Sequence, residues 1–115
     1  AIDYLAEHEN SVLILGDMGE LGEASEQAHS DVGTYAAQQN IGALLAVGRY
    51  SELAVKSFGK YGEWYPSQKE LIEALRKRDL QDNSILVKGS RGSKMENVVQ
   101  AILTFGEKHN AGLAG

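Results

Sequence analysis

Residues 11–22 of this chain read SVLILGDMGELG, and this stretch decides the fold that the other segments complete. Its apolar core, residues 12–15, is a continuous run that ends abruptly at Gly16 and Asp17. A run of this kind, without the alternation of a half-exposed strand, is typical of a strand covered on both faces, as in parallel sheets. The glycine and the acid that follow indicate a turn at its carboxyl end.

Two later segments repeat this pattern. Residues 43–47 (ALLAV) end at Gly48, and residues 85–87 (ILV) end at Lys88 and Gly89. A weaker candidate, residues 63–65 (EWY), is stopped by Pro66, and its two aromatic residues are most simply core or edge residues. The chain therefore predicts three buried strands and one shorter strand.

Helical patterns alternate with these strands. Between residues 25 and 39 one face carries Ala28, Val32, Tyr35 and Ala36. Ser51 is placed to cap a short helix that Gly59 closes, with Leu53, Ala54 and Phe58 inward. Capping boxes at residues 67–70 and 93–96 each precede an apolar stripe. These stripes are Leu71, Ile72 and Leu75, then Met95, Val98, Val99, Ile102 and Leu103, the second ending near Gly106.

The alternation of strands and helices predicts an α/β domain built from right-handed βαβ units around a mainly parallel sheet. The length of 115 residues suits one domain. We expect that domain to occupy residues 1–109, beginning on a helix that places Ile2, Leu5 and Ala6 on one face. Residues 110–115 (NAGLAG) are small and are interpreted as a flexible tail.

Composition excludes several classes of protein. The net charge of −5 argues against a broad nucleic-acid surface. The chain has no cysteine, which excludes disulfides and thiolate chemistry and fits a reducing cytoplasm. Its apolar runs are far shorter than the roughly 18 residues of a membrane span, and the first residues lack the pattern of a signal peptide.

Ligands of an open parallel sheet collect beyond the carboxyl ends of its strands, so three loops are expected to meet there. They are residues 16–24, the acidic loop; residues 48–50; and residues 88–93, the basic loop. The acidic loop could accept hydrogen bonds from an ammonium group or a basic residue of another domain. It could equally be a turn whose acids favour the start of the next helix.

The basic loop, KGSRGS, runs straight into a helix pattern. Lys88, Arg91 and the backbone N–H groups at a helix start could bind an anion, and Arg91 could hold a carboxylate with two parallel hydrogen bonds. A capped turn with solvated bases explains the same residues. Neither a Walker phosphate loop nor Gly-x-Gly-x-x-Gly occurs in the chain. No histidine pair has metal-ligand spacing, and a lone helical residue such as His29 is more often a packing or capping residue than a catalyst.

Several of these motifs, taken together, resemble the C-terminal domain of the Mur ligase family, in particular of its members that add D-alanyl-D-alanine. The matching pieces are LGDMGELG at 15–22, Glu26 and His29, Val47-Gly48, and LVKGSR at 86–91 followed by Met95-Glu96. The resemblance extends from Ile2 to about Lys108. The first and last pieces are specific as a pair, although each alone would be weak.

The resemblance implies a Rossmann-like three-layer domain of a larger cytoplasmic enzyme with ATP and magnesium in a central domain. That enzyme activates the UDP-N-acetylmuramoyl-tripeptide carboxylate and joins it to D-alanyl-D-alanine. Because this chain lacks the N-terminal and central domains, we expect it to be inactive alone, with no cofactor, metal or catalytic residue of its own. Positions implied to face substrate are Asp17, Met18, Glu20, Leu21, Gly22, His29, Lys88, Gly89, Ser90 and Arg91.

Two other functions fit parts of the pattern. In a signalling receiver domain, Asp17 would be the phosphoacceptor and Lys88 the lysine that accompanies it. However, the additional pair of acidic residues that binds magnesium in such domains is not where the first strand would place it. A stand-alone anion- or nucleotide-binding module would act through the basic loop alone.

Overall fold

The structure is a computed structural model that describes residues 2, 10–18, 24–78, 80 and 83–114, with residues 106–114 described by their backbone alone. Apart from Ile2, the predicted first helix lies outside the described residues. The elements follow in the order β1 (Ser11–Leu15), α2 (Ser25–Gln38), β2 (Ala43–Val47), α3 (Ser51–Phe58), β3 (Gly62–Tyr65), α4 (Gln68–Lys77), β4 (Ser84–Lys88), η2 (Arg91–Ser93) and α5 (Glu96–Ala114).

The four strands form one parallel sheet in the order β3-β2-β1-β4, which confirms the predicted alternation. Leu13 of β1 lies opposite Leu44 of β2 and Leu86 of β4. The central strands β1 and β2 are buried throughout, as their apolar runs predict. The expectation that residues 85–87 are equally buried is wrong: β4 is half-buried because it lies at the edge of this sheet.

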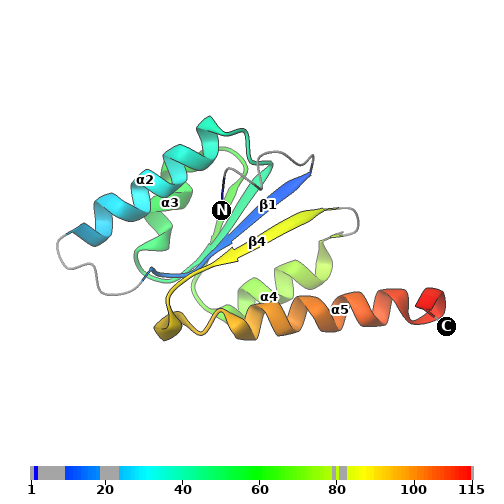
Figure 1. The fold of residues 1–115 in the computed structure, drawn as a ribbon. Coiled ribbons are helices and arrows are strands. Elements are labelled where there is room, and N and C mark those ends of the chain that lie inside the picture. Colours follow the sequence, from blue (N-terminus) through cyan, green and yellow to red (C-terminus); the bar gives the residue numbers. More distant parts are fainter. Residues whose placement is uncertain (1, 3–9, 19–23, 79, 81–82, 115) are drawn as a thin grey trace.

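Helices cover both faces of the sheet, so the domain has the predicted three layers (Figure 1). One layer, α2 and α3, packs on Leu13, Leu15 and Leu44, while α4 and α5 pack on the opposite face against Ile14 and Leu45. Alternate residues of each central strand thus enter different cores, which is why both strands need apolar side chains at every position.

The buried face of α2 differs from the predicted one. It carries Ser25, His29, Gly33 and Ala36, whereas Tyr35, predicted inward, is 38% exposed. The cause is the close approach of α3: a Cβ atom at Gly33 would collide with the backbone carbonyl of Ala54. The small side of α2 therefore faces α3, and the larger Tyr35 is turned outward.

The two predicted capping boxes have different outcomes. Ser67 caps α4, and its hydroxyl accepts a hydrogen bond from the backbone N–H of Glu70. Ser93 does not cap α5, because its hydroxyl donates to the carbonyl of Ser90 and α5 begins later, at Glu96. A left-handed residue, Lys94, separates the short η2 helix from α5.

The last helix also differs from its prediction in length and exposure. It continues past Gly106 to Ala114, since one glycine weakens a helix by only about 1 kcal/mol and does not end it. Within the predicted apolar stripe, Met95 and Val98 are buried, whereas Val99 and Leu103 are exposed. Among the described residues, no helix is long and apolar enough to cross a membrane.

Candidate functional site

The loops that follow β1, β2 and β4 meet at the carboxyl edge of the sheet, as predicted. The backbone N–H of Gly16 donates to the carbonyl of Lys88 at 2.8 Å, and that of Ser90 donates to the carbonyl of Asp17 at 3.0 Å. These bonds extend the ladder between β1 and β4 into their loops. The beginning of the acidic loop and the basic loop therefore form one joined edge.

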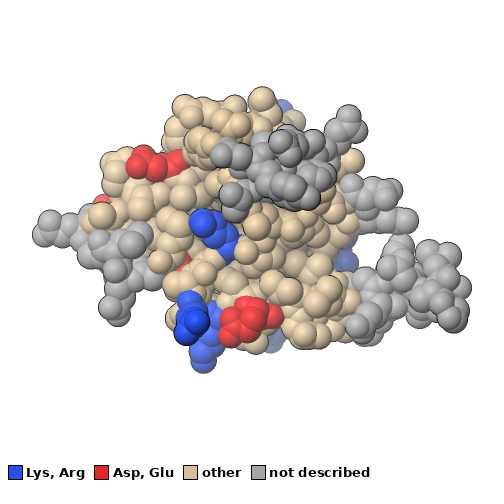
Figure 2. Space-filling view, in the orientation of Figure 1, with Lys and Arg blue, Asp and Glu red and all other residues tan. Residues whose placement is uncertain are grey.

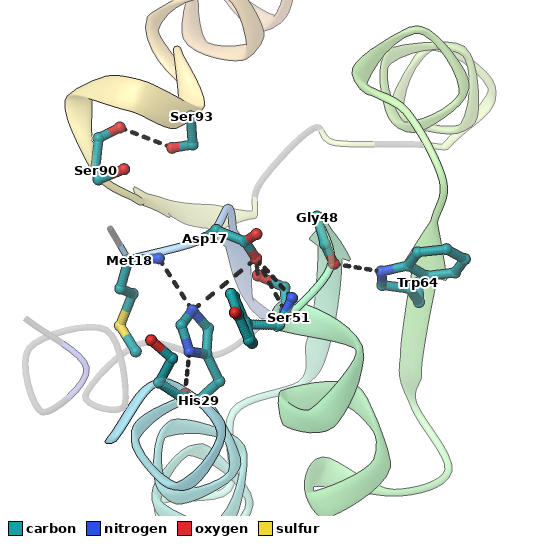
Figure 3. Close-up of polar contacts among 10 residues, drawn as sticks. Asp17, Met18, His29, Gly48, Ser51, Trp64, Ser90 and Ser93 are labelled. Carbon is teal, nitrogen blue, oxygen red and sulfur yellow. Dashed lines mark hydrogen bonds and ion pairs between the residues drawn. The ribbon is translucent and has the colours of Figure 1, made fainter. Parts of the chain in front are cut away.

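Asp17 connects this edge to the loop after β2 (Figure 3). Its Oδ1 accepts hydrogen bonds from the backbone N–H of Tyr50 at 3.1 Å and from the N–H and hydroxyl of Ser51, each at 3.0 Å. The predicted cap at Ser51 is thus wrong. Ser51 is the first residue of α3, and the carboxylate of Asp17 satisfies the free N–H groups of that helix end.

Gly48 provides the room that this carboxylate needs. Its φ of +113° lies in a region that favours glycine, and an added Cβ would approach Asp17 Oδ1 to 2.5 Å. The carbonyl of Gly48 accepts a hydrogen bond from the indole Nε1 of Trp64 at 2.9 Å. Trp64 of β3, expected as a core or edge residue, therefore also holds the loop after β2.

His29 is buried against Asp17 and Met18, with no exposed surface. Its Nε2 accepts a hydrogen bond from the backbone N–H of Met18 at 3.0 Å, and its Nδ1 lies 2.6 Å from the carbonyl oxygen of Ser25. Asp17 Oδ1 is 4.0 Å from Nε2, and the Tyr50 ring packs at a centroid distance of 5.6 Å. Figure 3 shows the imidazole lying between α2 and the residues that begin the loop. This geometry gives His29 a positioning role.

The basic residues of the edge face outward. Lys88 and Arg91 are exposed, and within the described residues neither takes part in an ion pair. Figure 2 shows basic side chains gathered beside the turn between β4 and α5, with an acidic side chain next to them. Such outward cations are available to an anionic ligand. Three further predicted site residues, Glu20, Leu21 and Gly22, lie outside the described residues.

Gly89 and Gly16 lie against the start of α5. A Cβ added to Gly89 would lie 2.7 Å from both Met95 Cγ and Ser93 Oγ, and one added to Gly16 would lie 2.6 Å from Met95 Sδ. A larger residue at either position would require the side chains of Met95 and Ser93 to move. Their role at the site is to let the joined edge and α5 approach closely.

Sequence reasoning missed two polar residues at this edge. The guanidinium of Arg49 lies 5.5 Å from the centroid of the Tyr50 ring, in cation–π contact beside the Asp17 cap. Gln68, the first residue of α4, donates to the carbonyls of Ser93 and Lys94. The position of both residues just beyond the ends of parallel strands was a signal that could have found them.

The described residues hold no group of three or more histidine, aspartate or glutamate side chains that could bind a metal ion. The sequence contains no Walker phosphate loop. The joined edge offers hydrogen bonding and positive charge to a ligand. Lys88 and Arg91 supply the exposed cations, and Asp17 and His29 hold the glycine-rich backbone in place.

The chain is similar to known proteins over most of its length. The profile of the family described as "Mur ligase, glutamate ligase domain" matches residues 1–91. A UDP-N-acetylmuramoyl-tripeptide--D-alanyl-D-alanine ligase of Escherichia coli (strain K12) is 40% identical over 105 residues, covering 89% of this chain and 23% of the relative. The enzyme of the same name from Bacillus subtilis (strain 168) is 32% identical over 97 residues, covering 80% and 21%.

A solved structure shows the same fold. A crystal structure of MurF from Acinetobacter baumannii superposes with a TM-score of 0.73 at 30% sequence identity, over 86% of this chain and 23% of that chain. This chain thus spans less than a quarter of the length of these relatives.

Proposed function

Because this chain belongs to the Mur ligase family as its C-terminal domain, we propose that it works within a longer ligase. In this proposal the ligase is ATP-dependent and cytoplasmic and adds D-alanyl-D-alanine to the UDP-N-acetylmuramoyl-tripeptide in peptidoglycan synthesis. The names of the relatives support the reaction and its two substrates. The domain itself is taken to span residues 1–109. Residues 110–115, expected as a tail, include the end of helix α5 at Ala114.

The proposed role of this domain is to bind and orient the incoming dipeptide. The observation that carries it is the joined edge, where backbone hydrogen bonds unite the two loops and leave Lys88 and Arg91 exposed. The dipeptide must direct its amine at the carboxyl group that it attacks, so its own carboxylate needs an anchor at the opposite end. Arg91 is assigned to that anchor because a guanidinium offers two parallel N–H donors, whereas Lys88 offers a point charge.

The other proposed site residues shape this edge. Asp17 and His29 hold the beginning of the acidic loop. Met18, Glu20, Leu21 and Gly22 are assigned to substrate contact because they belong to the matching motif. Gly89 and Ser90 set the course of the basic loop next to Asp17. ATP and magnesium are assigned to other domains of the ligase, because this chain has no phosphate loop in its sequence. The isolated chain is therefore proposed to be inactive.

The receiver alternative loses its main support. A phosphoacceptor needs a carboxylate that is free to attack, but Oδ1 of Asp17 accepts three hydrogen bonds at the start of α3. This oxygen holds two segments together.

Steady-state kinetics of Arg91→Ala in the full-length ligase test the proposal, with Arg76→Ala on α4 as the control. Charge-assisted hydrogen bonds are typically worth about 1.5–3 kcal/mol, so the KM for D-alanyl-D-alanine should rise roughly ten- to a hundredfold. The KM for ATP should stay the same. An unchanged dipeptide KM beside a raised ATP KM would show that Arg91 contacts phosphate instead. Ligation by the purified 115-residue chain would refute the assigned inactivity.

A further inference from the structure

The turn between the basic loop and α5 has an uncommon backbone conformation. Lys94 has a φ of +53° and a ψ of +42°, the left-handed region that a residue with a Cβ rarely adopts. This one residue stops the η2 helix, which contains Arg91, from continuing into α5. The direction in which the Arg91 side chain projects from the domain therefore depends on the conformation of Lys94. Local hydrogen bonds from Ser93 and Lys94 to Ser90 and Arg91 close the η2 turn but do not attach it to another element.

The bond from Ser90 to Asp17 attaches the start of this turn to the loop after β1, and Gln68 attaches its end to α4. Its side-chain Nε2 donates to the carbonyl of Ser93 at 2.6 Å and to the carbonyl of Lys94 at 3.2 Å, on both sides of the left-handed residue. An amide NH2 group has two hydrogens, so one side chain can satisfy both acceptors. Gln68 is itself well placed, since it is the first residue of α4, directly after the capping residue Ser67.

We propose that Gln68 is a positioning residue for D-alanyl-D-alanine binding, which it promotes by holding the Ser93–Lys94 turn so that Arg91 meets the dipeptide carboxylate. This inference rests on the proposed function, because it gives Arg91 its ligand. Gln68 does not itself touch the dipeptide. Its hydrogen bonds attach the basic loop, at the edge of the sheet, to α4, a helix on one face of the sheet.

The chemistry required of residue 68 is hydrogen-bond donation, and this makes a sharp test. Gln68→Glu has the same shape, but its carboxylate cannot donate and would face two carbonyl oxygens. Gln68→Met also lacks the donors and adds no charge, so it serves if the glutamate variant fails to fold. Lys69→Met is the matched control, since Lys69 is an exposed neighbour on the same helical turn and has no hydrogen bond or ion pair with the described residues of the basic loop.

The first measurement is hydrogen–deuterium exchange of the segment 90–97 in the full-length ligase. We expect faster exchange in Gln68→Glu and Gln68→Met and no change in Lys69→Met. The second is steady-state kinetics, in which the dipeptide KM should rise roughly three- to tenfold, as expected for loss of neutral hydrogen bonds, while the ATP KM stays constant. In an Arg91→Ala background the same Gln68 substitutions should have no further effect on the dipeptide KM.

Each outcome has a definite meaning. Unchanged exchange in both Gln68 variants overturns the inference, whatever the role of Arg91. It is also overturned if Arg91→Ala raises the dipeptide KM but the Gln68 variants do not, or if their effect persists in full without Arg91. If Arg91→Ala leaves the dipeptide KM unchanged, the carboxylate role under the proposed function is wrong and the kinetic part of this inference falls with it. The exchange result then still decides separately whether Gln68 holds the turn.

Discussion

The carboxylate of Asp17 lies at the start of a helix 34 residues away, where its Oδ1 accepts hydrogen bonds from both the backbone N–H and the hydroxyl of Ser51. The two residues belong to different βα connections, one after β1 and the other after β2. Their contact therefore fixes the two loops relative to each other. It also gives a partner to the backbone N–H of Ser51, which the start of a helix would otherwise leave unpaired.

Replacing Asp17 with alanine should destabilise the domain. Loss of an acidic helix cap typically costs about 0.5–2 kcal/mol, and the partial burial of these donors favours the upper part of that range. Urea unfolding followed by circular dichroism measures the change, with Asp31→Ala on the exposed face of α2 as the control. Equal effects of the two substitutions would contradict the capping role.

Gly48→Ala should be more destabilising than Gly59→Ala. Both glycines have a φ near +110°, so each substitution introduces backbone strain of about 1–3 kcal/mol. An alanine at Gly48 also meets the Asp17 carboxylate, whereas no atom lies within 4 Å of a Cβ at Gly59. The difference in free energy of unfolding between the two variants reports this contact. In an Asp17→Ala background that difference should shrink, and its persistence would point to another cause.

The imidazole of His29 should carry its proton on Nδ1. Nε2 accepts from the backbone N–H of Met18 and so must present a lone pair, whereas Nδ1 faces the carbonyl of Ser25 and must present a hydrogen. Long-range ¹H–¹⁵N NMR spectra distinguish the two tautomers by their nitrogen shifts. A proton found on Nε2 would mean that His29 does not hold Met18.

Removing the His29 side chain should cost about 2–4 kcal/mol of stability, because it creates a cavity and leaves the Met18 N–H without its partner. The effect should also be local. Amide exchange at Met18 should become faster in His29→Ala by more than exchange in β2, and a uniform increase across the domain would argue for a purely global loss of stability.

Tyr65 provides a pH-dependent test. Burial, reinforced by the hydrogen bond to Glu63, raises the pKa of the Tyr65 phenol from 10.0 to about 12. The folded state therefore retains this proton at a pH where the unfolded chain has lost it, and the associated stabilisation is present below pH 10 and lost between about pH 10 and 12. The pH dependence of unfolding should be shallower in that window for Tyr65→Phe than for the original chain. Parallel curves would contradict the shift.

The sequence predicted the central fold well because one type of signal dominates it. Continuous apolar runs at residues 12–15 and 43–47 have few explanations other than strands buried on both faces, and their glycine ends located the edge where the loops meet. The alternation of strands and helices then predicted a parallel sheet. Burial was harder to predict for β4, because a strand at the edge of the sheet has the same apolar composition as a central one.

The site was predicted less completely because its key contacts join residues far apart in the chain. A serine before a helix pattern suggests a local cap, and nothing near Ser51 shows that Asp17 takes this role from another loop. Likewise, the serine–glutamate spacing at residues 93–96 matches a capping box, but the left-handed turn at Lys94 moves the helix start. The contribution of Gln68 depends on the packing of α4 beside α5, which a linear pattern does not encode.

The backbone bonds from Gly16 to Lys88 and from Ser90 to Asp17 have a mechanical consequence. Two loops joined by backbone hydrogen bonds cannot move independently without breaking those bonds. A force applied at Arg91 is therefore transmitted through Asp17 to the start of α3. In the proposed ligase, movement of this edge toward another domain would then come mainly from a hinge outside the edge, with the sheet acting as a stiff lever. Under the same proposal, stiffness of the sheet would turn a rotation far from the substrate into a definite displacement at the dipeptide.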